Sequence, residues 1–162
     1  FRAEQTAEDD VFAEELFELM RMWYDEIEHA ALETGIAIPD DGRSRVEIAR
    51  DWVERYEGVH LQVTSGSKSK YTYADVRDVE ENTFLERDMY PADIGDREAF
   101  LFSYRLVFVP ENEKAFQWSM AGNTGPHSGD EEAPEGAMEY HRYGYMYRDE
   151  DGWRCDGVGT GP

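Results

Sequence analysis

Two side chains capable of proton transfer, Glu139 and His141, lie two positions apart near the C-terminus. If this stretch is a strand, alternate residues share one face, so the carboxylate would stand beside the imidazole and His141 could act as a general base. The same face continues through Tyr143, Tyr145 and Tyr147, so the alternative is a histidine hydrogen-bonded within a tyrosine-rich wall. The sequence favours this structural alternative, because no catalytic spacing accompanies the pair.

Other reactive side chains are scattered along the chain. Tyr56 and His60 lie near the end of a predicted helix, and Asp75 and Tyr104 are residue types that an acid–base site could use. No spacing ties any of them to one reaction. Cys155 is the only cysteine, which excludes an internal disulfide, and we expect a half-buried strand thiol because no base lies beside it in the sequence.

Acid-rich turns raise the question of metal binding. The stretches 88–96 (DMYPADIGD) and 149–152 (DEDG) lack the alternating oxygen ligands and the closing glutamate of an EF-hand loop. The stretch 127–135 (HSGDEEAPE) could attract a cation only loosely. We therefore expect solvated acids in these turns, no metal site and no cofactor.

Composition limits the classes of partner. The chain has 162 residues and a net charge of -21, from 37 acidic against 16 basic residues. Such a surface repels phosphate, so we expect neither nucleic acid nor an anionic membrane as a partner. No apolar run is long enough to span a bilayer. Residues 1–7 read as a polar tether, typical of a cropped or mature exported chain, and residues 8–162 as a single domain.

Two amphipathic helices are predicted in the first third of the chain. Apolar residues recur at three- and four-residue steps over residues 8–33. The motif SRVE at 44–47 is a capping box that opens the second helix, and Gly58 suits its end. Its apolar stripe comprises Val46, Ala49, Trp52, Val53 and Tyr56. Residues just beyond, from His60, form either a short strand or an extra turn.

From residue 71 the period changes to two, which is typical of strands. The predicted strands are 71–81, a weaker one at 82–88, 99–109, 115–121, and a last hairpin that turns at 149–152. The loop 122–136 has no apolar anchor, and we expect it to be mobile. Helices followed by a meander of strands predict an α+β fold, in which N-terminal helices pack on a curved antiparallel sheet of five to six strands.

Alternation also sorts the aromatic side chains. One face of the strand 99–109 carries Phe100, Phe102, Tyr104, Leu106 and Phe108. Arg105 alternates to the opposite face and is expected on the outer surface. A curved sheet needs bulky residues on its concave side, so we expect the tyrosines of the last hairpin to form a central wall of the core.

In this order of elements the chain resembles the nuclear transport factor two-like (cystatin-like) superfamily, and in particular small exported lipoproteins of Gram-positive bacteria. The stretches that carry the resemblance are 52–58 (WVERYEG), which ends a helix in an aromatic, and 151–161 (DGWRCDGVGTG), which closes the sheet. The resemblance implies a cone-shaped sheet, a pocket between sheet and helices, and frequent dimers through the outer face of the sheet.

On this basis we expect a non-catalytic module of the cell envelope that binds a small apolar molecule or serves in assembly. We expect the protein to be extracellular or anchored to the cell envelope. The alternative is a small lyase or isomerase that acts on an apolar substrate in the cone pocket. The candidate pocket residues are Tyr56, His60, Tyr104, Trp118, His141 and Tyr143.

Overall fold

The N-terminal part of the chain is only partly described. The computed structural model describes residues 10–18, 20, 35–67, 69–112, 124–128 and 132–162. Residues 10–18 are helical, within the predicted helix 8–33, and the rest of that prediction, apart from Met20, lies outside the described residues. Large apolar side chains of this helix, including Phe12 and Phe17, are exposed, so among the described residues its apolar stripe is not buried on the sheet.

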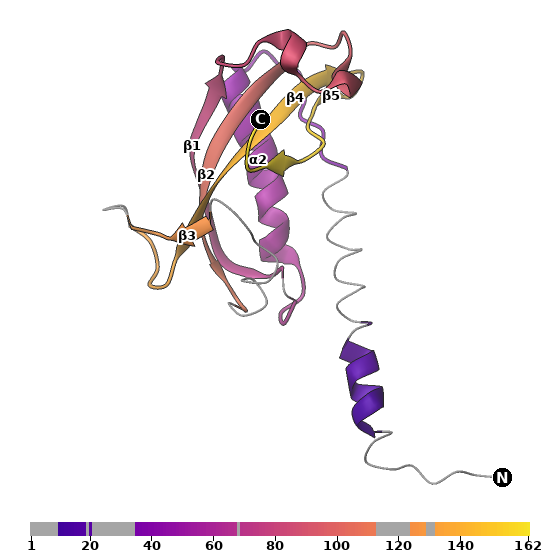
Figure 1. The fold of residues 1–162 in the computed structure, drawn as a ribbon, viewed down its shortest axis with the longest axis vertical. Coiled ribbons are helices and arrows are strands. Elements are labelled where there is room, and N and C mark those ends of the chain that lie inside the picture. Colours follow the sequence, from indigo (N-terminus) through magenta and orange to yellow (C-terminus); the bar gives the residue numbers. More distant parts are fainter. Residues whose placement is uncertain (1–9, 19, 21–34, 68, 113–123, 129–131) are drawn as a thin grey trace, which may run out of the picture.

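The remaining elements form an α+β fold, as predicted (Figure 1). In chain order they are α2 (Arg45–Gln62), β1 (Tyr71–Asn82), η1 (Arg87–Met89), η2 (Ala92–Ile94), β2 (Ala99–Pro110), β3 (Thr124–Pro126), β4 (Met138–Asp149), β5 (Gly152–Arg154) and β6 (Val158–Gly159). Six antiparallel strands make one strongly curled sheet in the order β1-β2-β4-β3, and β5 and β6 both pair with β4. Helix α2 runs alongside this sheet (Figure 1). No helix among the described residues combines the length and the apolar character that crossing a membrane requires.

Helix α2 begins where the sequence predicts and ends later. The capping box is formed, because the Ser44 side chain accepts from the Glu47 backbone N–H while the Glu47 side chain accepts from the Ser44 backbone N–H. The prediction that Gly58 ends the helix was wrong, since the helix continues to Gln62. Glycine is tolerated inside a helix at a cost of about 1 kcal/mol, and the buried side chain of Val59 anchors the additional turn. His60 therefore lies on an extra helical turn.

The two long strands predicted at 71–81 and 99–109 are confirmed by β1 and β2. The weaker strand predicted at 82–88 was wrong, because β1 ends at Asn82 and the chain continues through an exposed bend into η1. The loop 122–136 contains the short edge strand β3, which pairs with β4 through its backbone and so needs no apolar side chain. The strand predicted at 115–121 lies outside the described residues.

Strand pairing decides which aromatic side chains enter the core. The predicted aromatic face of β2 is fully buried, with exposures of 1% or less. Tyr104 pairs with Arg142, so the core face of β4 carries Arg142 and its alternate neighbours, whereas Tyr143 and Tyr145 point to the other side. The prediction that these tyrosines wall the core was wrong in its choice of face. They contact Phe84 and Tyr90, which lie in the segment between β1 and β2.

Gly144 shows how closely the core is packed at this point. A methyl group at its Cα would lie 2.7 Å from Phe102 Cζ and 3.2 Å from Cys155 Sγ. Both neighbours are themselves held, Phe102 by complete burial and Cys155 by a hydrogen bond from its thiol to the Gly157 carbonyl. Alanine at this position therefore has to displace core side chains.

We predict that Gly144→Ala lowers the free energy of unfolding by about 1–3 kcal/mol, the usual cost of overpacking. Chemical denaturation measures this change. Gly125→Ala is the matched control, because nothing lies within 4 Å of the added methyl group in β3. Equal stability of the two variants would contradict the close packing of Phe102 against Gly144.

Candidate functional site

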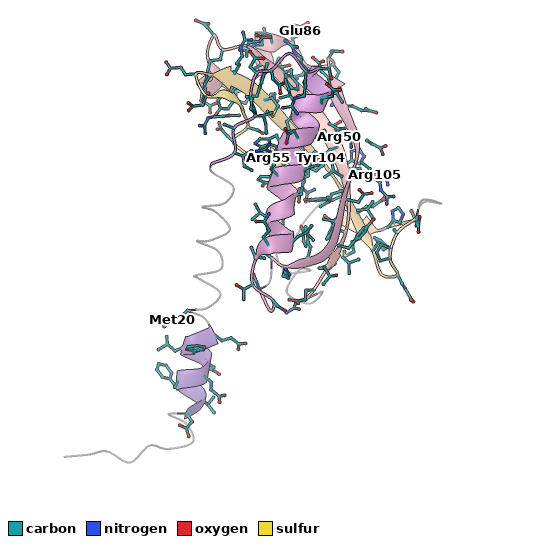
Figure 2. All side chains as sticks on the ribbon, turned by 180° about the vertical axis from the view of Figure 1, so that it is seen from behind. Met20, Arg50, Arg55, Glu86, Tyr104 and Arg105 are labelled. Atoms are coloured by element: carbon teal, nitrogen blue, oxygen red, sulfur yellow. The ribbon has the colours of Figure 1, made fainter. Side chains whose placement is uncertain are left out.

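A carboxyl group lies in the middle of the core. The side chain of Glu57, on α2, is 1% exposed. Its Oε1 accepts hydrogen bonds from the hydroxyl of Tyr104 on β2, at 2.6 Å, and from the hydroxyl of Tyr140 on β4. Figure 2 shows Tyr104 close to α2. One carboxyl group thus joins the helix to two neighbouring strands.

Three further side chains enclose this carboxyl group. His60 follows Glu57 by three residues on α2, and its Nε2 lies 3.9 Å from Glu57 Oε2. The imidazole stacks on Tyr71 of β1 with ring centroids 4.3 Å apart. The guanidinium of Arg142 lies over the Tyr140 ring, 4.1 Å from its centroid. We call Glu57, His60, Tyr71, Tyr104, Tyr140 and Arg142 the carboxyl cluster.

Burial controls the titration of the cluster. Loss of hydration raises the pKa of Glu57, and this outweighs the two tyrosine hydrogen bonds and the charge of Arg142, which act in the opposite direction. Burial also raises the pKa of Tyr104 and Tyr140, and the neighbouring Glu57 raises both further. Burial lowers the pKa of His60. Burial therefore favours the neutral forms of Glu57, His60, Tyr104 and Tyr140, beside the charged Arg142.

The hydrogen bonds indicate which oxygen of Glu57 would carry a proton when the carboxyl group is neutral. His60 Nδ1 lies 2.8 Å from the Ser69 carbonyl, which can only accept, so Nδ1 carries the hydrogen and Nε2 of the neutral ring is an acceptor. Glu57 Oε1 already accepts from two hydroxyls, while Oε2 is buried without a hydrogen-bond partner among the described residues. A proton on Oε2 would lie on the side of His60 Nε2, which at 3.9 Å is beyond direct hydrogen-bond distance.

A separate cavity of about 200 Å³ opens between α2 and the C-terminal segment. Its lining residues are Ile36, Trp52, Tyr56, Tyr147, Arg154, Cys155 and Asp156. The rings of Trp52 and Tyr56 stack with centroids 4.6 Å apart and form an aromatic wall. Trp52 is 1% exposed, and its indole N–H has no hydrogen-bond partner among the described residues.

Polar groups occupy the other side of this cavity. The Tyr147 hydroxyl donates to Asp156 Oδ1 at 2.7 Å. Arg154 forms ion pairs of 3.0 Å with both Asp149 and Asp151, which fix its guanidinium. Burial raises the pKa of the Cys155 thiol to about 12, so this sulfur is protonated at neutral pH and is a poor nucleophile. The cavity thus combines an aromatic wall with one fixed cation and one fixed anion.

The candidate residues chosen from the sequence divide into three groups. Tyr56 lines the cavity, and His60 and Tyr104 belong to the carboxyl cluster beside it. His141 is exposed, and both His141 and Tyr143 lie on the opposite face of β4 from Arg142. The structure therefore does not bring these two residues to the others. Trp118 lies outside the described residues.

The acid–base pair considered first has other partners. Glu139 is hydrogen-bonded to His127 and to Arg105, which hold its pKa below the usual range. Arg105 lies on the outer face, as predicted, and also contacts Asp78 at 2.9 Å. Asp78 has a positive φ of 53° at an irregularity between β1 and β2, a conformation that aspartate tolerates. These contacts form an ion network on the outer face.

The sequence reading missed Glu57, the residue on which the cluster depends. Its position continues the apolar stripe of α2, four residues after Val53 and three before His60. An acid in a stripe that is otherwise apolar indicates a buried partner, and this pattern could have identified it. Its partners Tyr104 and Tyr140 come from distant strands, which spacing alone does not reveal.

No group of three or more potential metal ligands is assembled within the described part of the chain. The chain matches no protein-family model, no curated protein and no solved structure, so its function has to be inferred from its own residues.

The carboxyl cluster predicts a specific pH dependence of stability. Because the folded state raises the pKa of Glu57 above its ordinary 4.5, the native protein holds this proton when the unfolded chain has lost it. The Glu57 contribution is thus most favourable at low pH and weakens as the pH rises above about 4.5, by about 1.4 kcal/mol per unit of pKa shift. We predict that Glu57→Gln is progressively more stable relative to the wild type from pH 4 to pH 8.

Urea denaturation across this pH range measures the difference between the two proteins. Exposed Glu54 on the same helix provides the matched control Glu54→Gln, whose difference from the wild type should be nearly constant with pH. A constant difference for Glu57→Gln as well would contradict a raised pKa at Glu57.

Proposed function

We propose that this protein is a non-catalytic module that binds a small molecule in the cavity between α2 and the C-terminal segment. The observation that carries the proposal is a cavity walled by the stacked rings of Trp52 and Tyr56, whose centroids lie 4.6 Å apart. A bound molecule that packs against the partly exposed Tyr56 ring would remove apolar surface from water, which favours binding.

The composition of the cavity supports binding. Ligand sites are concave, largely apolar, and carry a few polar groups that orient the bound molecule. Here Ile36 and the two stacked rings supply apolar surface, and Asp156 and Arg154 supply fixed polar groups. The volume of about 200 Å³ suits a molecule smaller than an ordinary drug.

A small lyase or isomerase is the second candidate, and the carboxyl cluster is the observation that favours it. A raised-pKa acid beside tyrosines and a histidine is an arrangement that proton-transfer enzymes use. However, Glu57 and Tyr104 are at most 1% exposed, and neither lines the cavity. A substrate in the cavity would not touch the acid, so the geometry supports binding better than catalysis.

The resemblance to the nuclear transport factor two-like superfamily remains part of the proposal. A strongly curled antiparallel sheet with a helix against it supports a cone of that kind. A place in the cell envelope and a homodimer through the outer face of the sheet stay predictions. On that face Arg105 is already engaged by Asp78 and Glu139 within the chain.

Ligand-observed NMR with a library of small polar fragments tests the proposed function. We predict that a subset of fragments binds the wild type and that Ile36→Trp abolishes this binding, because the larger ring fills the cavity. Leu61→Trp is the control, since Leu61 is 40% exposed on α2 and does not line the cavity.

Circular dichroism would establish that both variants retain the fold. A library without any binder, or binders that Ile36→Trp leaves unaffected, would exclude this cavity as a binding site.

A further inference from the structure

Two opposite charges lie two residues apart in the lining of the cavity, Arg154 at the end of β5 and Asp156 just beyond it. Two residues of extended chain span about 7 Å. Each charge is held in place by a neighbour within the chain: Arg154 by two aspartates, and Asp156 by the Tyr147 hydroxyl. The cavity therefore presents a fixed dipole to whatever enters it.

Each charge keeps capacity for a further contact. A guanidinium has five N–H donors, and the two aspartates contact the Nε and Nη2 atoms of Arg154. An ionised carboxylate accepts at two oxygens, and the Tyr147 hydroxyl bonds to Oδ1 of Asp156. The acceptor side borders on aromatic rings, whose faces attract cations.

We propose that the ligand of this cavity is a small zwitterion, an α-amino acid or a betaine, an inference that rests on the proposed function. Its carboxylate accepts from the Arg154 guanidinium. Its ammonium group contacts the Asp156 carboxylate and the faces of the neighbouring aromatic rings. Glycine betaine and an amino acid of the size of valine share this pattern of charges at a scale that suits the cavity.

A molecule with a single charge satisfies only half of this arrangement. An anion would meet Arg154 but also the carboxylate of Asp156, and the strongly acidic chain as a whole repels it. A cation would meet Asp156 but would leave the remaining N–H donors of Arg154 without an acceptor. A neutral ring would stack on the aromatic wall and leave both charges without a partner.

Isothermal titration calorimetry on the full chain tests the proposal with five probes: glycine betaine, L-valine, tetramethylammonium, isobutyrate and phenol. We expect at least one zwitterion to bind about tenfold or more tightly than either singly charged probe, the gain expected from one additional charged hydrogen bond. Binding of glycine betaine but not L-valine identifies a betaine site, and the reverse identifies an amino-acid site.

Asp156→Asn should weaken zwitterion binding by about tenfold, because asparagine still accepts from Tyr147 but has lost the charge that holds the ammonium group. Glu150→Gln is the control for net charge, since Glu150 is exposed in the hairpin turn and does not line the cavity. It should leave the affinity unchanged.

If phenol or a singly charged probe binds as tightly as the zwitterions, or more tightly, the proposal of a zwitterionic ligand is wrong. The proposal that the cavity binds a small molecule would still stand. An unchanged affinity of the Asp156→Asn variant for zwitterions would also contradict the proposal of a zwitterionic ligand. Absence of binding for all five probes, together with a fragment library that yields no binder sensitive to Ile36→Trp, would overturn both proposals.

Discussion

The burial of one carboxyl group is the constraint on which this structure depends. Glu57 lies on α2, and its two hydrogen-bond donors, Tyr104 and Tyr140, come from the adjacent strands β2 and β4. An acid without such donors could not stay in this core, because a buried polar group without hydrogen bonds is strongly destabilising. The pairing therefore fixes the rotation of α2 about its axis and its position along the sheet.

The position of α2 decides which side chains of β4 and of α2 itself face the core. With Tyr140 turned towards the helix, alternation puts Tyr143 and Tyr145 on the outer face, where the segment between β1 and β2 covers them. The same rotation divides consecutive residues of α2 between two roles. Glu57 enters the core, whereas Tyr56 stacks on Trp52 and lines the cavity. The proposed binding site thus lies beside fully buried core residues, among them Trp52 and Glu57.

The sites differ in what they can do chemically. The carboxyl cluster has the residue types of a proton-transfer site, but its groups are enclosed by their own partners. The cavity has room for a ligand, but its thiol is protonated and its charged groups are held by neighbouring side chains. We therefore propose binding without turnover, since the reactive groups and the accessible space are separated.

The local sequence pattern alone predicted the capping box of α2, the long strands β1 and β2, the hairpin turn at 149–152 and the apolar face of β2. These features are predictable because helix caps and side-chain alternation depend on neighbours in the sequence. The extension of α2 past Gly58, the edge strand β3 and the inward face of β4 depend on burial and pairing between distant segments. The cavity needed the tertiary structure most of all. Its aromatic wall comes from α2 and its charges from the last ten residues, and only packing of the chain brings them together.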